Sequence, residues 1–182
     1  MKKTSLSNLI AAAVLIAIPS LAFSKTYVGL KGESQIAYHL HHPMHEIEGA
    51  SKDFDCTVDL GSDTTHAKVH VKAKIENFNS GNSSRDSHMM EVTDAMKYPF
   101  VEFTSDSVRH ETSGYRVFGK LSFHGVKKNL DFVVVPTYVK DRIDIKGGFT
   151  VSLTDYKIDR PALLFVKTAD ELNMALDVVV KQ

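Results

Sequence analysis

The residues of this chain best suited to metal chemistry are three histidines in its N-terminal third. His39, His41 and His45 are followed by Glu46 and Glu48. Imidazole nitrogens together with a carboxylate can bind Zn²⁺, Cu²⁺ or Ni²⁺. The spacing matches no closed zinc pattern, and the second histidine of the His-Glu-x-x-His metalloprotease helix is missing. The cluster therefore suggests, as one alternative, a metal site on the surface of a strand.

The sequence offers no arrangement typical of an enzyme or of a nucleic-acid-binding protein. It has no G-x-S-x-G elbow, no phosphate-binding glycine loop and no obvious nucleophile beside a base. Its 22 basic and 22 acidic side chains balance, whereas a nucleic-acid surface needs clustered positive charge. Cys56 is the only cysteine, so an intrachain disulfide is excluded. We therefore expect a protein that has no catalytic residues, uses no cofactor and binds no nucleic acid.

The first 24 residues are typical of a targeting segment. Lys2 and Lys3 precede an apolar run over residues 9–18, and Ala22-Phe23-Ser24 fits a small-x-small cleavage site. The pattern predicts a signal peptide over residues 1–24, with cleavage near Ser24 and Lys25. Residues 25–182 then form one exported domain.

The rest of the chain alternates apolar and polar residues in the manner of half-buried β-strands. In residues 66–75, for example, Val69, Val71 and Ala73 face one way and the intervening lysines and histidines the other. About eight strands are predicted, over residues 34–40, 54–60, 66–75, 100–107, 115–123, 130–139, 143–153 and 172–180. This spacing is typical of an antiparallel sandwich or of a barrel, and periodicity alone does not choose between them.

One helix interrupts this pattern near residues 84–97. Ser83 precedes Asp86 by three positions, a variant of the capping box, and Met89, Val92 and Met96 fall on one helical face. We expect Pro99 to end the helix.

The segment 130–139 is the least regular strand. Phe132 to Val135 are all apolar, so we expect both faces to be covered, with packing against the helix as one explanation. Pro136 indicates a sheet edge or a bulge nearby, because it cannot donate a ladder hydrogen bond.

Several short motifs resemble a known family. They are Arg85-Asp86-Ser87-His88, Lys97-Tyr98-Pro99, Phe103-Thr104-Ser105 and the run from Gly119 to Val126. Their order and spacing resemble the YceI-like proteins over Tyr27 to Val180. The resemblance implies a periplasmic or secreted protein that binds polyisoprenoid lipids. It also favours closure, so the expected fold is all-β: an antiparallel lipocalin-like barrel of about eight strands with a short helical segment near residues 84–97.

We therefore predict a pocket for an isoprenoid or similar amphiphilic lipid, with transient membrane contact as a further expectation. The inward apolar residues predicted to line it are Tyr38, Leu40, Phe103, Leu121, Phe123, Phe149, Leu172 and Met174. The same side chains could instead pack a solid core. Arg85 and His88 are predicted to orient a headgroup, helped by the N-H groups of the helix start. Alternatively, Arg85 and Asp86 only pin the helix to the barrel rim.

Overall fold

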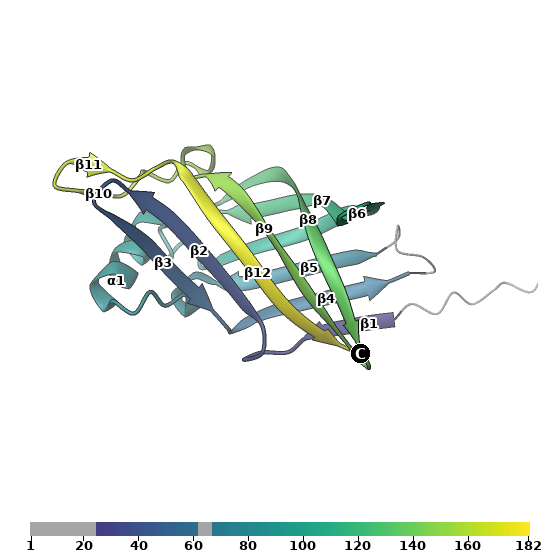
Figure 1. The fold of residues 1–182 in the computed structure, drawn as a ribbon. Helices are drawn as coiled ribbons and strands as arrows, with labels where there is room; N and C mark the ends of the chain where they lie inside the picture. Colours follow the sequence, from purple (N-terminus) through teal and green to yellow (C-terminus); the bar gives the residue numbers. More distant parts are fainter. Residues whose placement is uncertain (1–24, 62–66) are drawn as a thin grey trace, which may run out of the picture.

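The computed structural model describes residues 25–61 and 67–182, so the predicted signal peptide lies outside the described residues. Most of the described chain is extended (Figure 1). The strands are β1 (Lys25–Gly29), β2 (Gln35–His42), β3 (His45–Ser51), β4 (Phe54–Leu60), β5 (Lys68–Lys74), β6 (Phe100–Glu111), β7 (Gly114–Phe123), β8 (Val126–Val139), β9 (Arg142–Ser152), β10 (Ala162–Leu163), β11 (Val166–Lys167) and β12 (Glu171–Lys181). The helices are α1 (Ser83–Val92) and the 3₁₀ turns η2 (Ile75–Asn77) and η3 (Thr154–Tyr156).

Eight of the strands form a closed antiparallel barrel. The order β1-β4-β5-β6-β7-β8-β9-β12 returns to β1, because Val28 pairs with Lys181 and Gly29 with Val180. Strand β2 pairs with the other part of β12, from Leu172 to Asp177, and β3 pairs with β2. The predicted closure is therefore confirmed, with the β2–β3 hairpin as an addition that extends the wall beyond the ring.

Ser34 fills the seam where β12 changes partner from β1 to β2. This serine is only 2% exposed. Its hydroxyl accepts a hydrogen bond from Val179 N and donates one to Val179 O, at 3.0 and 3.2 Å. Leu30 N also donates to Val179 O, at 2.8 Å. The backbone groups of Val179 at this seam are thus satisfied by the Ser34 hydroxyl together with Leu30 N.

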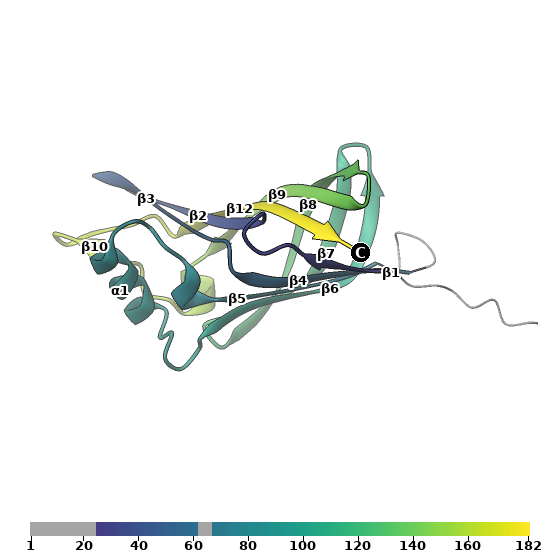
Figure 2. The same ribbon diagram turned by 90° about the horizontal axis from the view of Figure 1, so that it is seen from below.

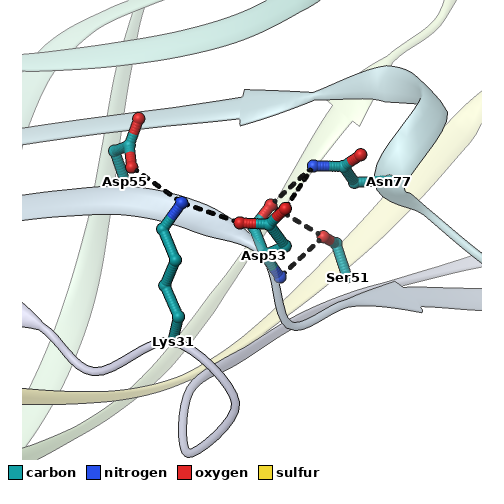
Figure 3. Close-up of polar contacts among 5 residues, drawn as sticks. All are labelled: Lys31, Ser51, Asp53, Asp55 and Asn77. Carbon is teal, nitrogen blue, oxygen red and sulfur yellow. Dashed lines mark hydrogen bonds and ion pairs between the residues drawn. The ribbon is translucent and has the colours of Figure 1, made fainter.

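A polar cluster fixes the corner where β3 passes into β4 (Figure 3). Lys31 Nζ lies 2.7 Å from Asp53 and 3.1 Å from Asp55, and both carboxylates, Asp53 first, raise the pKa of Lys31. Asn77 Nδ2 donates to both the backbone and side-chain oxygens of Asp53. The Ser51 hydroxyl donates to the backbone oxygen of Asp53 and accepts a hydrogen bond from its backbone N-H. The cluster ties the β1–β2 turn, the β3–β4 corner and η2 together.

The helix is shorter than predicted. Asn82, not Ser83, is the N-cap residue, and its Oδ1 accepts a hydrogen bond from Arg85 N at 3.1 Å. The helix ends at Val92, before Asp94 takes a left-handed φ of 46°, so Pro99 does not end it. Met96 consequently leaves the predicted apolar face and is 93% exposed. Among helices of the described ranges, none has the length and apolar character to cross a membrane.

The prediction that both faces of segment 130–139 are covered is wrong. Val135 and Tyr138 are 50% and 63% exposed. Strand β8 pairs with β7 as far as Val134 and with β9 from Val134 onward. Pro136 therefore lies in the part of β8 that has no β7 neighbour. This agrees with the predicted sheet edge, because proline has no backbone N-H to donate to a neighbouring strand.

The sequence interpretation also missed β1, β3 and the small β10–β11 hairpin. The hairpin turn is unusual, because Leu164 and Phe165 both adopt left-handed φ values, of 50° and 68°. Asn-Gly is the usual pair in such a turn. A left-handed conformation costs an ordinary residue about 1–2 kcal/mol, so this turn places two bulky apolar residues where the backbone disfavours them.

Apolar side chains fill one part of the barrel interior. A group including Ile36, Phe54, Cys56, Val178 and Val180 packs at less than 10% exposure. Burial raises the pKa of the Cys56 thiol to about 12. The thiol is therefore protonated at neutral pH, as expected for a buried cysteine in a structural role.

Candidate ligand cavity

The rest of the barrel interior contains a cavity of about 190 Å³. A cavity of about 150 Å³ with walls of leucine, isoleucine and phenylalanine stays dry and binds benzene. Among the described residues that line the cavity, only Tyr38, Arg85, His88 and Thr93 have a polar atom able to form hydrogen bonds of ordinary strength. The interior is therefore not a solid core, and its shape suits an apolar guest.

All ten residues predicted as ligand-binding line this cavity. They are Tyr38 and Leu40 on β2, Arg85 and His88 on α1, Phe103 on β6, Leu121 and Phe123 on β7, Phe149 on β9, and Leu172 and Met174 on β12. The strand register explains why the eight residues on strands meet.

Met174 pairs with Tyr38 on one side and with Phe149 on the other, and Phe103 pairs with Leu121. Residues that are directly opposite in an antiparallel pair point to the same face of the sheet. Assigning the inward-facing residues of each strand correctly was therefore enough to predict the strand residues that line the cavity.

The sequence interpretation missed several wall residues. Phe132 of β8 lies between Phe103 and Phe149, with ring centroids 5.2 and 5.1 Å apart. Its segment was predicted as a strand, but the apolar run 132–135 concealed which face points inward. Ile158 and Pro161 line the cavity from the irregular segment between η3 and β10, where no strand or helix period exists to reveal them.

Most polar groups of the lining come from α1 and the residue that follows it, Thr93. Thr93 Oγ1 already donates to Met89 O at 2.7 Å. His88 Nδ1 lies 3.5 Å from Glu91, on the exposed side of the helix. Arg85 is half-buried and has no carboxylate of the described residues within ion-pair distance. The guanidinium is therefore the charged group available to a guest at this end, which we call the polar end.

Tyr38 also lies near the polar end. Its pKa is raised, first by burial and then by the negative charge of Asp86, while Arg85 opposes this shift. The Tyr38 hydroxyl is thus neutral at physiological pH and can donate a hydrogen bond. Its ring also packs against Phe78, with centroids 6.0 Å apart. Tyr38 offers a polar atom within an otherwise apolar wall.

The structure separates the two roles that the sequence left open for Arg85 and Asp86. Asp86 Oδ1 accepts a hydrogen bond from Ser80 N at 3.0 Å and holds the loop that precedes the helix. Asp86 therefore makes a structural contact, although this contact reaches the loop before the helix and not a strand of the barrel rim. Arg85 lines the cavity without such a contact to another described side chain.

The alternative metal site receives no support from the geometry. His39 and His41 both contact the Glu46 carboxylate, at 2.9 and 2.6 Å, and these contacts lower the pKa of Glu46. His45 instead packs against the His42 ring, with centroids 4.9 Å apart. Within residues 25–61 and 67–182, no three His, Cys, Asp or Glu side chains are placed to hold a metal ion.

Comparison with known proteins identifies the domain. The model of the YceI-like domain matches residues 27–180. UPF0312 protein plu2095 of Photorhabdus laumondii is 29% identical over 133 residues, which cover 70% of this chain and 69% of the relative.

Solved structures share the fold at low sequence identity. Burkholderia cenocepacia BcnA has a TM-score of 0.76 and 17% identity, over 83% of this chain and 98% of BcnA. A polyisoprenoid binding domain from Saccharophagus degradans, implicated in plant cell wall breakdown, has a TM-score of 0.62 and 12% identity, over 85% and 97% of the two chains. The present chain belongs to the YceI-like family.

Proposed function

We propose that this protein is an exported, non-enzymatic carrier, buffer or sensor that holds one isoprenoid or related lipid chain inside its barrel, in the periplasm or outside the cell. The observation that carries the proposal is the cavity of about 190 Å³, whose described polar lining groups come from α1, Thr93 and the Tyr38 hydroxyl, with apolar walls elsewhere. An amphiphile has the same asymmetry. Its chain fits the apolar walls and its headgroup the polar end. The polyisoprenoid binding domain of Saccharophagus degradans shares this fold and supports the choice of lipid class.

Apolar burial alone supplies enough free energy for tight binding. Each buried CH₂ group contributes roughly 0.8 kcal/mol. Ordering a flexible chain and losing its translational freedom consume much of this gain. The affinity should therefore rise with chain length until the cavity is full and then level off.

A titration of delipidated protein with prenyl alcohols of increasing length tests the proposal. We expect one molecule bound per barrel, with affinity increasing by at least about tenfold from a short to a medium chain and a plateau at greater length. Isothermal titration calorimetry in cyclodextrin-buffered solution provides the measurement. An absence of uptake at every chain length would overturn the proposed function.

The free guanidinium of Arg85 leads to a prediction about headgroup selectivity. Arg85→Ala should weaken binding of a prenyl phosphate by about tenfold, because a charge-assisted hydrogen bond is lost. Binding of the matching prenyl alcohol should change by less than about twofold. Calorimetry with both ligands measures the difference.

Two further variants control this experiment. Arg85→Lys keeps the charge and should lose less affinity than Arg85→Ala, although a lysine lacks the planar fork. Arg109→Ala removes an equal charge from an exposed position that packs on Phe118, outside the cavity lining, and should leave both affinities unchanged. Equal losses for alcohol and phosphate in Arg85→Ala would contradict a headgroup role.

A further inference from the structure

An exposed apolar surface lies at the same end of the barrel as α1. It consists of the tip of the β10–β11 hairpin, from Leu163 to Val166, together with Met44 in the β2–β3 turn. Phe165 and Leu164 are 102% and 71% exposed, and Met44 is 59% exposed. We call this surface the apolar tip. A soluble protein gains nothing from displaying these side chains to water, so their position calls for a partner.

The apolar tip is built into the barrel rather than hanging from it. His42, which is 1% exposed, donates from Nε2 to Val166 O at 2.9 Å. Its Nδ1 accepts from Met44 N at 3.1 Å. One buried imidazole therefore holds the hairpin and the β2–β3 turn together. Because both contacts are to backbone atoms, the position of the tip is set without use of its apolar side chains.

The tip is also continuous with the cavity wall. Ile158 and Pro161 line the cavity, and β10 begins at the next residue, Ala162. Thr168 N donates to Pro161 O at 2.9 Å and closes the base of the hairpin. Figures 1 and 2 both place the hairpin and α1 at the same end of the barrel, away from the C-terminus. A partner that contacts the tip would thus lie at the same end of the barrel as α1.

Basic residues outnumber acidic ones in the hairpin and its immediate flanks, although Asp155, Asp170 and Glu171 border this segment. Lys157, Arg160 and Lys167 are opposed within residues 157–168 only by Asp159. Apolar side chains flanked by basic ones are the combination that binds the interface of an anionic bilayer.

We propose that the apolar tip inserts into the surface of an anionic lipid bilayer and thereby places the polar end of the cavity against the headgroups. A second copy of the chain is less suitable, since stable protein interfaces use about 20–30 residues on each side, whereas the tip offers five. A bilayer surface needs only a few apolar anchors. The use of this contact for lipid exchange rests on the proposed function, but the contact itself does not.

The experiment uses the absence of tryptophan from the sequence. Phe165→Trp puts a single fluorophore at the tip, and Val135→Trp puts one on an exposed position of β8. With phosphatidylglycerol vesicles, the emission of Phe165→Trp should shift to shorter wavelength and be quenched by brominated lipid. The emission of Val135→Trp should remain unchanged. No shift and no quenching for Phe165→Trp would overturn the proposal.

Vesicle flotation gives an independent reading. The double variant Leu164→Ser/Phe165→Ser should lose at least about fivefold of its binding to phosphatidylglycerol vesicles. The control Val28→Ser/Val135→Ser, which removes apolar side chains that are also about half exposed, should bind as the unmodified protein does. Unchanged binding of the tip variant would contradict bilayer insertion. A second result would also contradict it: an unmodified protein that sediments as a dimer and does not bind vesicles, with a tip variant that sediments as a monomer. This result would assign the tip to contact with a second copy of the chain.

The same variants distinguish failure of this proposal from failure of the proposed function. Uptake of a prenyl alcohol from cyclodextrin should be equal in the tip variant and in the unmodified protein, since the tip residues do not line the cavity. Equal uptake with no vesicle contact in either protein would reject the docking surface alone. Vesicle contact without uptake would reject the lipid-carrier function and leave the docking surface standing.

Discussion

Filling the cavity with indole rings should abolish lipid uptake while the barrel remains folded. Val71 and Leu172 line the cavity from β5 and β12. Both are partly buried and line the cavity of about 190 Å³, into which larger side chains at these positions would extend. Val71→Trp/Leu172→Trp should therefore weaken prenyl alcohol binding by more than about tenfold. The melting temperature should stay the same or rise, since filling a void restores lost van der Waals contacts.

Fluorescence provides the control for this variant. Because the unmodified chain has no tryptophan, a blue-shifted emission would report that the two introduced rings are buried. Val135→Trp places the same ring outside the barrel and should bind lipid normally. Retained uptake with both rings buried would show that lipid binds elsewhere on the protein.

The second large effect is expected at Gly119, where the barrel wall leaves no room for a methyl group. A Cβ atom there would lie 2.4 Å from Thr104 O and 2.6 Å from the Phe103 ring. The backbone oxygen cannot move without disturbing the β6–β7 pairing. Gly119→Ala should lower the free energy of unfolding by about 2–3 kcal/mol, and the melting temperature by about 4–12 °C for a domain of this size. It should also weaken lipid uptake, because Phe103 lines the cavity.

Gly81→Ala is the matched control for this substitution. Gly81 has a left-handed φ of 74°, but a Cβ atom would meet nothing within 4 Å. Its substitution carries only the conformational cost, about 1 kcal/mol. Thermal unfolding followed by circular dichroism compares the two variants. If Gly119→Ala were no more destabilising than Gly81→Ala, the close contact with Phe103 and Thr104 would be in error.

The strands of the barrel and much of the cavity lining could be predicted from the sequence, because the alternation of apolar and polar residues shows which side chains of a strand face inward. Leu172 and Met174 alternate with polar residues, as do Leu121 and Phe123, so the inward face of each strand could be assigned. Closure itself depends on the two residue pairs between β1 and β12. The alternation pattern does not show whether the first and last strands pair. The resemblance to a barrel family was therefore needed to choose a closed barrel over a sandwich.

The missed elements have local physical causes. Strand β3 contains Gly49, which has no side chain of its own and is covered by the Tyr38 ring of the paired strand β2. The sequence of β3 alone therefore shows only a weak strand pattern. The β10–β11 hairpin lacks the Asn-Gly signal, since Leu164 and Phe165 occupy its turn. The helix end was misplaced because Asp94 takes the left-handed position that glycine usually marks. In each case, an interaction from outside the segment or an atypical residue replaces the usual signal.

Native mass spectrometry of the protein purified from its own cells without detergent tests the central claim most directly. The account predicts a complex with one amphiphile per chain. Extraction and fragmentation should identify an isoprenoid or a related lipid, and Val71→Trp/Leu172→Trp should carry none. A ligand-free mass for the unmodified protein, together with no uptake of added prenyl lipid, would contradict the account.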